Sequence, residues 1–217
     1  MSAGPNILAF VIAYFLGSIP TGYLAGRAKG IDIRTVGSKN IGATNVFRIL
    51  GKGPGIVVLL VDALKGYLGC KLAPALAEVT FVGGARPLTG EWTIIIAGIG
   101  AILGHNYTCW LRFKGGKGVA TTAGVMIAFA PMALLMALAL WLVVFAASRY
   151  VSLASIAAAI SLPFATWLAG GSGKFIGIAG SVGALAIYKH KANIRRLLDG
   201  TENRFGKKSQ PSAAETK

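Results

Sequence analysis

The sequence GVATTAGVMIAFAPMALLMALALWLVVFAAS, residues 118–148, runs for 31 positions without a charged side chain. A membrane-spanning helix needs about 20 apolar residues, so this block is too long for one ordinary span and short for two. Pro131 interrupts it, and a proline is a natural point for one helix to end and the next to begin. Further apolar blocks cover residues 6–26, 55–77, 92–111, 151–173 and 175–188. The sequence therefore predicts an all-α, polytopic integral membrane helix bundle.

The composition argues against the other common classes of protein. Hydrophobic residues make up 54% of the 217 positions and charged residues 13%, whereas a soluble domain carries about 25% charged residues. The net charge of +15 is typical of nucleic-acid-binding proteins, but the preference of Lys and Arg for cytoplasmic loops explains it better. We expect one membrane-embedded domain over residues 1–206, a polar, disordered tail over residues 207–217, and no nucleic-acid partner.

The distribution of charge predicts the orientation in the membrane. Residues 27–54 hold six Lys or Arg, residues 112–117 hold three, and residues 189–217 hold eight. The positive-inside rule places these stretches in the cytoplasm, with the N-terminus outside and the C-terminus inside. If Arg149 is also inside, the long apolar block crosses twice and the bundle has about seven spans; the alternative is five.

The first polar segment is GSKNIGATN, residues 37–45, followed by Arg48. It mimics a phosphate-binding P-loop, but Ala43 replaces the lysine and no strand precedes it, so we reject that fold. The hydroxyl groups of Ser38 and Thr44, with backbone N–H groups at the start of a helix near Thr44, still suit an oxyanion or phosphate. A polar loop that merely caps the helix is the alternative.

Two more polar segments lie on the same predicted face. The second has Gly104-His105 and then RFKGGKGVAT, residues 112–121, in which glycines surround Lys117 at the start of an apolar helix; this suits an anionic headgroup. The third is KHKANIRRLLDGTE, residues 189–202, where His190 and Asn193 share a helix face. A basic interfacial turn and a solvated basic helix are the respective alternatives.

Asp62 and Lys65 lie inside the apolar block 55–77, at a spacing of three that allows them to pair within a helix. Ionisable residues inside a membrane usually have a function, and a structural ion pair that holds neighbouring loops is an equal alternative. Cys70 and Cys109 sit in apolar surroundings without metal-ligand or disulfide spacing. We therefore expect neither a disulfide nor a metal site at these cysteines.

Four segments in this order closely resemble the bacterial acyl-phosphate:glycerol-3-phosphate acyltransferases, the PlsY family. They are residues 37–45, residues 113–121, the run RYVSLAS at 149–155, and His190-x-x-Asn193 with Gly-Thr-Glu202. The resemblance spans residues 15–205. Two positions depart from the family pattern: Lys39 replaces a usual glycine, and Thr108 replaces a common proline. Lys39 either crowds the loop or adds a phosphate contact, whereas Thr108 alters a turn.

The resemblance implies a multi-pass enzyme of the bacterial inner membrane with a cytoplasmic active site. It acylates the 1-hydroxyl of sn-glycerol 3-phosphate from an acyl phosphate, giving lysophosphatidate, the first acylation of phospholipid synthesis. The substrates and the lipid bilayer are its partners, and a soluble acyl-phosphate-forming enzyme is a further candidate. Combined with the segments above, it gives three sets of site residues: catalytic Ser38, Arg48, His190 and Asn193; substrate-binding Asn40, Thr44, Asn45, His105, Lys114, Gly115, Gly116, Lys117 and Gly118; and structural Glu202, Asp62 and Lys65.

The chemistry leaves one role open. An acyl phosphate is already activated, so phosphate should leave without a metal or a cofactor. The protein has to align the hydroxyl with the carbonyl and stabilise the oxyanion and the departing phosphate. The base is His190, His105 or a phosphate oxygen of the substrate. A transporter for a phosphorylated solute is a rival, but it needs polar groups near the midplane or on both faces. A lipid phosphatase, the other rival, calls for a clearer nucleophile and acid.

Overall fold

The computed structural model describes residues 3–82 and 91–206. This part of the chain forms ten α-helices and one short 3₁₀ helix, with no strand among its residues, which confirms the predicted all-α class. The predicted tail, residues 207–217, lies outside it. The elements are α1 (Ala3–Ser18), α2 (Thr21–Arg27), α3 (Ala43–Leu50), α4 (Lys52–Val82), α5 (Glu91–Asn106), η1 (Cys109–Leu111), α6 (Val119–Phe129), α7 (Pro131–Ser148), α8 (Val151–Leu168), α9 (Gly173–Lys189) and α10 (Lys191–Leu198).

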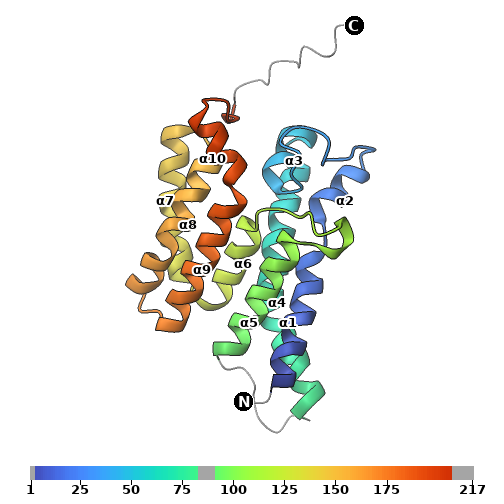
Figure 1. The fold of residues 1–217 in the computed structure, drawn as a ribbon, viewed down its shortest axis with the longest axis vertical. Coiled ribbons are helices and arrows are strands. Elements are labelled where there is room, and N and C mark those ends of the chain that lie inside the picture. The colour runs from blue at the N-terminus through green and yellow to red at the C-terminus, as the bar shows by residue number, and fades with distance from the viewer. Residues whose placement is uncertain (1–2, 83–90, 207–217) are drawn as a thin grey trace, which may run out of the picture.

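The helices form two groups that lie side by side (Figure 1). In the first group, α1, α4 and α5 pack against one another, and the short helices α2 and α3 rest on α4. In the second group, α7 packs on α8 and α8 on α9, with α10 against the ends of α8 and α9. Helix α6 stands between the groups, against α4 and α5 on one side and α7 on the other.

Small residues bring α1 and α5 into close contact. A Cβ atom on Gly104 would collide with the Tyr14 carbonyl oxygen, and one on Gly17 would collide with the Ala101 carbonyl oxygen. Glycine is therefore required on both helices for the backbones to approach this closely. Glycine at residues 17 and 104 thus permits the tight packing of these two helices.

The long apolar block divides at the proline, as predicted. Helix α6 ends at Phe129, and α7 begins with Pro131 in its first turn, where the missing N–H group is not needed. Helices α1 and α4 to α9 consequently run along the bundle as seven separate helices among the described residues. This arrangement supports seven spans rather than five, and the number that cross a bilayer stays a prediction.

Within the part of the chain that the structure describes, four segments are long and apolar enough to cross a membrane: Gly4–Arg27, Glu91–Leu111, Pro131–Ser148 and Val151–Leu168. Helix α7 is the least buried of the four, with 11% of its residues buried. Its side chains Leu135, Leu142 and Val143 are 54–65% exposed, which suits lipid contact rather than contact with water.

The first apolar block is broken at Pro20, between α1 and α2. Proline cannot donate a backbone hydrogen bond, so carbonyl groups near the break lose helical partners. The Lys65 ammonium donates to the Ile19 carbonyl oxygen at 2.8 Å and lies 2.8 Å from the Asp62 carboxylate. The ion pair predicted within α4 is present, and it also satisfies the break in the neighbouring helix.

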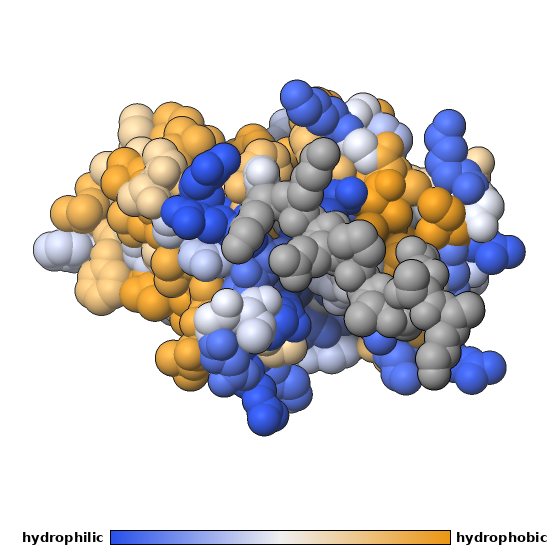
Figure 2. All heavy atoms as spheres, turned by 90° about the horizontal axis from the view of Figure 1, so that it is seen from above, coloured by the Kyte–Doolittle hydropathy of each residue, from blue (hydrophilic) through white to orange (hydrophobic). Residues whose placement is uncertain are grey.

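The three polar segments converge on one end of the bundle, where α2, α3 and α10 lie (Figure 1). Seen from that end, hydrophilic residues gather on the surface and a hydrophobic flank lies to one side (Figure 2). The convergence inferred from charge counting alone is therefore reproduced by the fold.

Candidate functional site

Asn45 holds the first polar segment in shape. Its side chain is 1% exposed, and its amide nitrogen donates to the carbonyl oxygens of Ile33, Val36 and Asn40 at 2.9–3.1 Å. Its amide oxygen accepts the backbone N–H of Ser38 at 2.9 Å. Both ends of its amide are engaged with the backbone of residues 33–40, a geometry that suits positioning Ser38, and its predicted role in substrate binding stays a prediction.

The segment turns through two residues with left-handed backbone. Gly37 has φ +59° and Lys39 has φ +57°. A left-handed residue with a side chain is strained by about 1–2 kcal/mol. The Lys39 side chain is exposed. The backbone at position 39 therefore favours glycine, and Lys39 keeps the turn with some strain.

The glycines of the second polar segment pack against the end of α5. Gly116 donates to the His105 carbonyl oxygen at 3.0 Å, and Gly115 donates to that of Asn106 at 3.2 Å. A Cβ atom on Gly116 would collide with the His105 ring, and one on Gly115 with the His105 carbonyl oxygen. These two glycines thus let the segment lie against α5, a reason that does not require a bound ligand.

Lys117, between these glycines and α6, contacts the third polar segment. Its ammonium donates to the Asn193 side-chain oxygen, and the Asn193 nitrogen donates to Glu202 at 2.7 Å. Glu202 also accepts hydrogen bonds from Ser152 at 2.9 Å and from Arg196 at 2.7 Å. The amide of Asn193 is thereby held with its oxygen toward the cation and its nitrogen toward the carboxylate.

The charges of this network shift the pKa values of both end members. Burial lowers the pKa of Lys117 to about 8; the Glu202 carboxylate opposes the shift, and the charges of Arg196 and Arg48 add to it. Burial alone would raise the pKa of Glu202, but hydrogen bonds led by those from Asn193 and Arg196 lower it. The site thus carries more positive than negative charge and favours anions.

His190 lies at the junction of α9 and α10 and is 3% exposed. Its Nδ1 atom is 2.7 Å from the Ala186 carbonyl oxygen. A carbonyl only accepts, so Nδ1 carries the hydrogen and Nε2 keeps a lone pair. Burial, aided by the charge of Lys117, lowers the pKa of His190 to about 4. The ring is therefore neutral at pH 7, and its Nε2 atom is able to accept a proton.

His105, predicted to bind substrate, is 5% exposed at the inner end of the site. Its Nδ1 atom is 3.6 Å from the Asp62 carboxylate, which itself pairs with Lys65. The glycine turn at 115–116 rests on this histidine. The structure thus connects the buried ion pair of α4 to the loop that carries Lys117.

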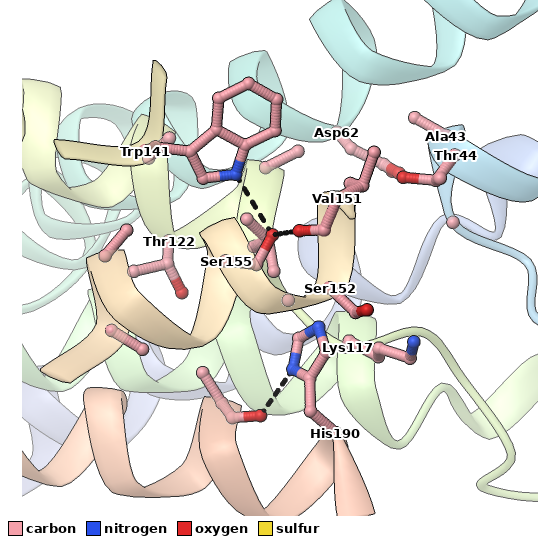
Figure 3. A pocket seen from close by; sticks show the side chains of 18 of the residues that line it. Ala43, Thr44, Asp62, Lys117, Thr122, Trp141, Val151, Ser152, Ser155 and His190 are labelled. Carbon is pink, nitrogen blue, oxygen red and sulfur yellow. Dashed lines mark hydrogen bonds between the residues drawn. The ribbon is translucent and has the colours of Figure 1, made fainter. Parts of the chain in front are cut away.

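A cavity of about 370 Å³ lies between the two groups of helices, and many of these side chains line it. Figure 3 shows Lys117, His190 and Ser152 facing the same space, with Trp141 held by a hydrogen bond from its Nε1 atom to Ser155 at 3.1 Å. The predicted site residues that line the cavity are Ser38, Asn40, Thr44, Asn45, Arg48, Asp62, His105, Lys117, Gly118, His190, Asn193 and Glu202.

Other predicted residues lie outside this lining. Gly115, Gly116 and Lys65 support it from behind, and Lys114 is exposed on the loop. Ser152 and Ser155 on α8 and Trp141 on α7 also line the cavity, although no role was predicted for them. The two serines belong to the motif at residues 149–155, and their spacing of three, which puts them on one helix face, is the signal that indicates them. No group of three or more His, Cys, Asp or Glu able to hold a metal occurs within residues 3–82 and 91–206.

The cavity has a cationic, polar mouth and continues between apolar side chains of α6, α7, α8 and α9. A helical membrane bundle with such a cavity is suited to an anionic, lipid-like molecule, with the charge held at the mouth and the apolar part within. This defines the class as an integral membrane protein that acts on anionic lipids or their precursors.

Comparison with known proteins identifies the family. The model of the family described as glycerol-3-phosphate acyltransferase matches residues 7–200. A glycerol-3-phosphate acyltransferase of Geotalea daltonii is 48% identical over 92% of this chain and 97% of its own length. One of Aquifex aeolicus is 45% identical over 90% and 96% respectively. This chain belongs to the glycerol-3-phosphate acyltransferase family.

Solved structures agree with this assignment. The crystal structure of PlsY (YgiH), an integral membrane glycerol 3-phosphate acyltransferase, in its glycerol 3-phosphate form is 43% identical, with a TM-score of 0.81 over 94% of this chain and 96% of that one. Its lysophosphatidic acid form is 42% identical, with a TM-score of 0.79. The family predicted from the four motifs is confirmed, and with it the class of integral membrane acyltransferase.

The network around Glu202 predicts a difference between two acidic residues. Glu202→Ala removes three hydrogen-bond acceptor contacts and should lower the free energy of unfolding by about 3 kcal/mol. Asp199→Ala is the matched control, because Asp199 is exposed and lies 3.9 Å from Arg195; it should change stability by less than about 0.5 kcal/mol. Thermal unfolding in detergent micelles measures both. Equal shifts would show that Glu202 has no special structural role.

Proposed function

We propose that this chain transfers a fatty acyl group from an acyl phosphate to the 1-hydroxyl of sn-glycerol 3-phosphate, giving lysophosphatidate and phosphate. The observation that carries the proposal is the continuity of one cavity from the cationic mouth at Arg48 and Lys117 to an apolar interior. Glycerol 3-phosphate and the phosphate of the donor suit the mouth, and the acyl chain suits the interior.

Charge is the first requirement of this reaction. Both substrates carry phosphate, so two anions have to be held close together while their repulsion is offset. The guanidinium of Arg48 remains protonated under all relevant conditions. Lys117 has a lowered pKa of about 8, and it gains charge when an anion binds beside it. Because the two cations come from different segments, each is able to take a different phosphate.

The acyl transfer itself needs orientation more than activation. The hydroxyl oxygen forms a bond to the carbonyl carbon, the carbonyl oxygen takes the negative charge, and the bond from carbon to the phosphate oxygen then breaks. The hydroxyl of Ser38, whose backbone N–H is held by the Asn45 side chain, suits stabilisation of that charge. No covalent acyl-enzyme step is required, because phosphate is already a good leaving group.

The hydroxyl proton has two destinations consistent with the site. The Nε2 atom of His190 holds a lone pair, since Nδ1 faces the Ala186 carbonyl oxygen. A phosphate oxygen of the substrate is the other acceptor. His105 is the weakest of the three candidates, because its ring lies against Gly116 and Asp62. We therefore assign His105, with Asp62 and Lys65, to positioning the loop that carries Lys117.

The donor assay tests the proposal directly. Purified protein in detergent or lipid cubic phase is given glycerol 3-phosphate with either a long-chain acyl phosphate or the matching acyl-CoA, in the presence of a metal chelator. Lysophosphatidate and released phosphate should appear with the acyl phosphate alone. Turnover with acyl-CoA, or folded protein that is inactive with acyl phosphate, would refute the assignment of the donor.

The lowered pKa of Lys117 predicts a pH dependence. Above about pH 8 the free enzyme loses the charge on this residue, while the phosphate of glycerol 3-phosphate, with its second pKa near 6, stays doubly charged. The kcat/KM for glycerol 3-phosphate should therefore fall as pH rises from 8 to 10, because kcat/KM reports groups of the free enzyme.

Two variants make this test specific. Lys117→Arg keeps its charge throughout that range, so its kcat/KM, although lower overall, should stay level between pH 8 and pH 10. Lys29→Ala, at an exposed position on α2's following loop, should fall as the unmodified protein does. A Lys117→Arg protein with the original profile would assign the titration to another group.

We also propose that the site faces the cytoplasm of a bacterial inner membrane and that residues 1–206 work as one domain. The Lys and Arg residues around α2, α3 and α10 support this orientation through the positive-inside rule. Single cysteines at Lys29 or Asp199 should resist an impermeant maleimide in intact cells, and one at Gly173, at the opposite end, should react. The background lacks Cys70 and Cys109, and the reverse labelling pattern would overturn the orientation.

A further inference from the structure

The apolar part of the cavity is lined along one face of each of four helices. The lining residues recur at helical spacing, so the cavity runs along the helix axes rather than across them. They are Thr122, Ala123 and Met126 on α6; Leu134, Ala137, Leu138 and Trp141 on α7; Ser155, Ala158, Ala159 and Leu162 on α8; and Val182, Gly183 and Ala186 on α9. We call this part of the cavity the shaft.

Below its deepest lining residues the shaft ends on packed side chains. Phe129 on α6, Ala165 on α8 and Ala179 on α9 lie three residues deeper than the last lining residue of their helix, and Ala133 is next to Leu134 on α7; all four belong to a hydrophobic cluster or pack against it and do not line the cavity. Met126, Leu134 and Leu162 line the cavity and also belong to this cluster or pack against it, and Met126 and Leu162 are 1% and 5% exposed. These three residues form the floor of the shaft.

The depth of the shaft is close to the length of one lipid chain. Ser152 at the mouth and Leu162 at the floor are ten residues apart on α8, and at 1.5 Å per residue this is roughly 15 Å. One leaflet of a bilayer has about half of the ~30 Å hydrocarbon thickness, again roughly 15 Å. A chain of ordinary membrane-lipid length, bound by its phosphate at the mouth, therefore reaches the floor.

The alternative is that the chain lies outside, in the lipid. Leu59 on α4 and Leu138 on α7 line the cavity and are 45% and 44% exposed, so its side is accessible from the bilayer. A chain that left there would not contact the floor, and its length would not matter. The hydrogen bond from Trp141 to Ser155 fixes the indole in the wall of the upper shaft. Because this wall is already ordered, it favours a path of the acyl chain into the shaft.

We propose that the floor formed by Met126, Leu134 and Leu162 sets the upper limit on the length of the acyl chain that the enzyme transfers. This inference rests on the proposed function, because it requires an acyl phosphate as donor. Chains that end above the floor are accommodated, and longer ones have to bend or displace core side chains, which raises the barrier in a closely filled interior.

The test is a chain-length profile of kcat/KM for dodecanoyl, tetradecanoyl, hexadecanoyl and octadecanoyl phosphate. Ala137→Leu adds bulk one turn above Leu134, within the shaft. It should lower the ratio of hexadecanoyl to dodecanoyl activity by about tenfold or more, given the 10-fold or larger discrimination that a single methylene group gives in an apolar pocket. Leu162→Ala should shift the profile toward octadecanoyl phosphate.

Ala139→Leu is the matched control, since it makes the same substitution on an exposed face of the same helix and should leave the profile unchanged. Retained turnover of dodecanoyl phosphate shows that Ala137→Leu is folded; should it fail to fold, Ala158→Leu narrows the shaft from α8. Unchanged profiles in the folded shaft variants would overturn the proposal and place the chain in the lipid. Unmodified protein inactive with every acyl phosphate would instead refute the proposed function.

Discussion

The hydrogen bond between Lys117 and Asn193 joins the two groups of helices across the cavity, and the site depends on it. Each buried cation near a membrane interior needs a partner, since an isolated charge in such surroundings is unstable. The negative charge comes from Glu202, which bonds to the Asn193 amide, and that amide in turn bonds to Lys117. The lysine is thereby held in place without being neutralised by direct contact, and it remains available to an incoming anion.

Deeper in the bundle, another buried charge network connects separate segments of the chain. The Asp62–Lys65 pair compensates the helix break at Pro20 on one side and contacts His105 on the other. Loop geometry at the surface is therefore fixed by charges buried in α4, because the glycine turn lies directly on His105. The ion pair of α4 and His105 thus help to determine where Lys117 lies.

Local sequence patterns predicted the features that depend on local rules. The division of the long apolar block follows from Pro131, the ion pair of α4 from a spacing of three, and the convergence of polar segments from charge placement. Contacts between residues that are distant in the sequence were not predicted. The carbonyl groups that Asn45 satisfies, the ring behind Gly116, and the serines of α8 in the cavity all depend on how helices meet, which periodicity does not encode. Those contacts give Asn45 and Gly116 a structural role, and their predicted part in substrate binding stays a prediction.

The half-exposed leucines beside the cavity, Leu59 and Leu138, have a kinetic consequence. A substrate dissolved in the bilayer reaches this side by diffusion in two dimensions, so its surface density, rather than its bulk molarity, governs the frequency of encounter. For the acyl phosphate donor that we propose, dilution of the membrane with inert lipid should then slow capture at constant total concentration. Glycerol 3-phosphate, arriving from the aqueous phase, follows ordinary solution kinetics, so the two proposed substrates obey different concentration scales.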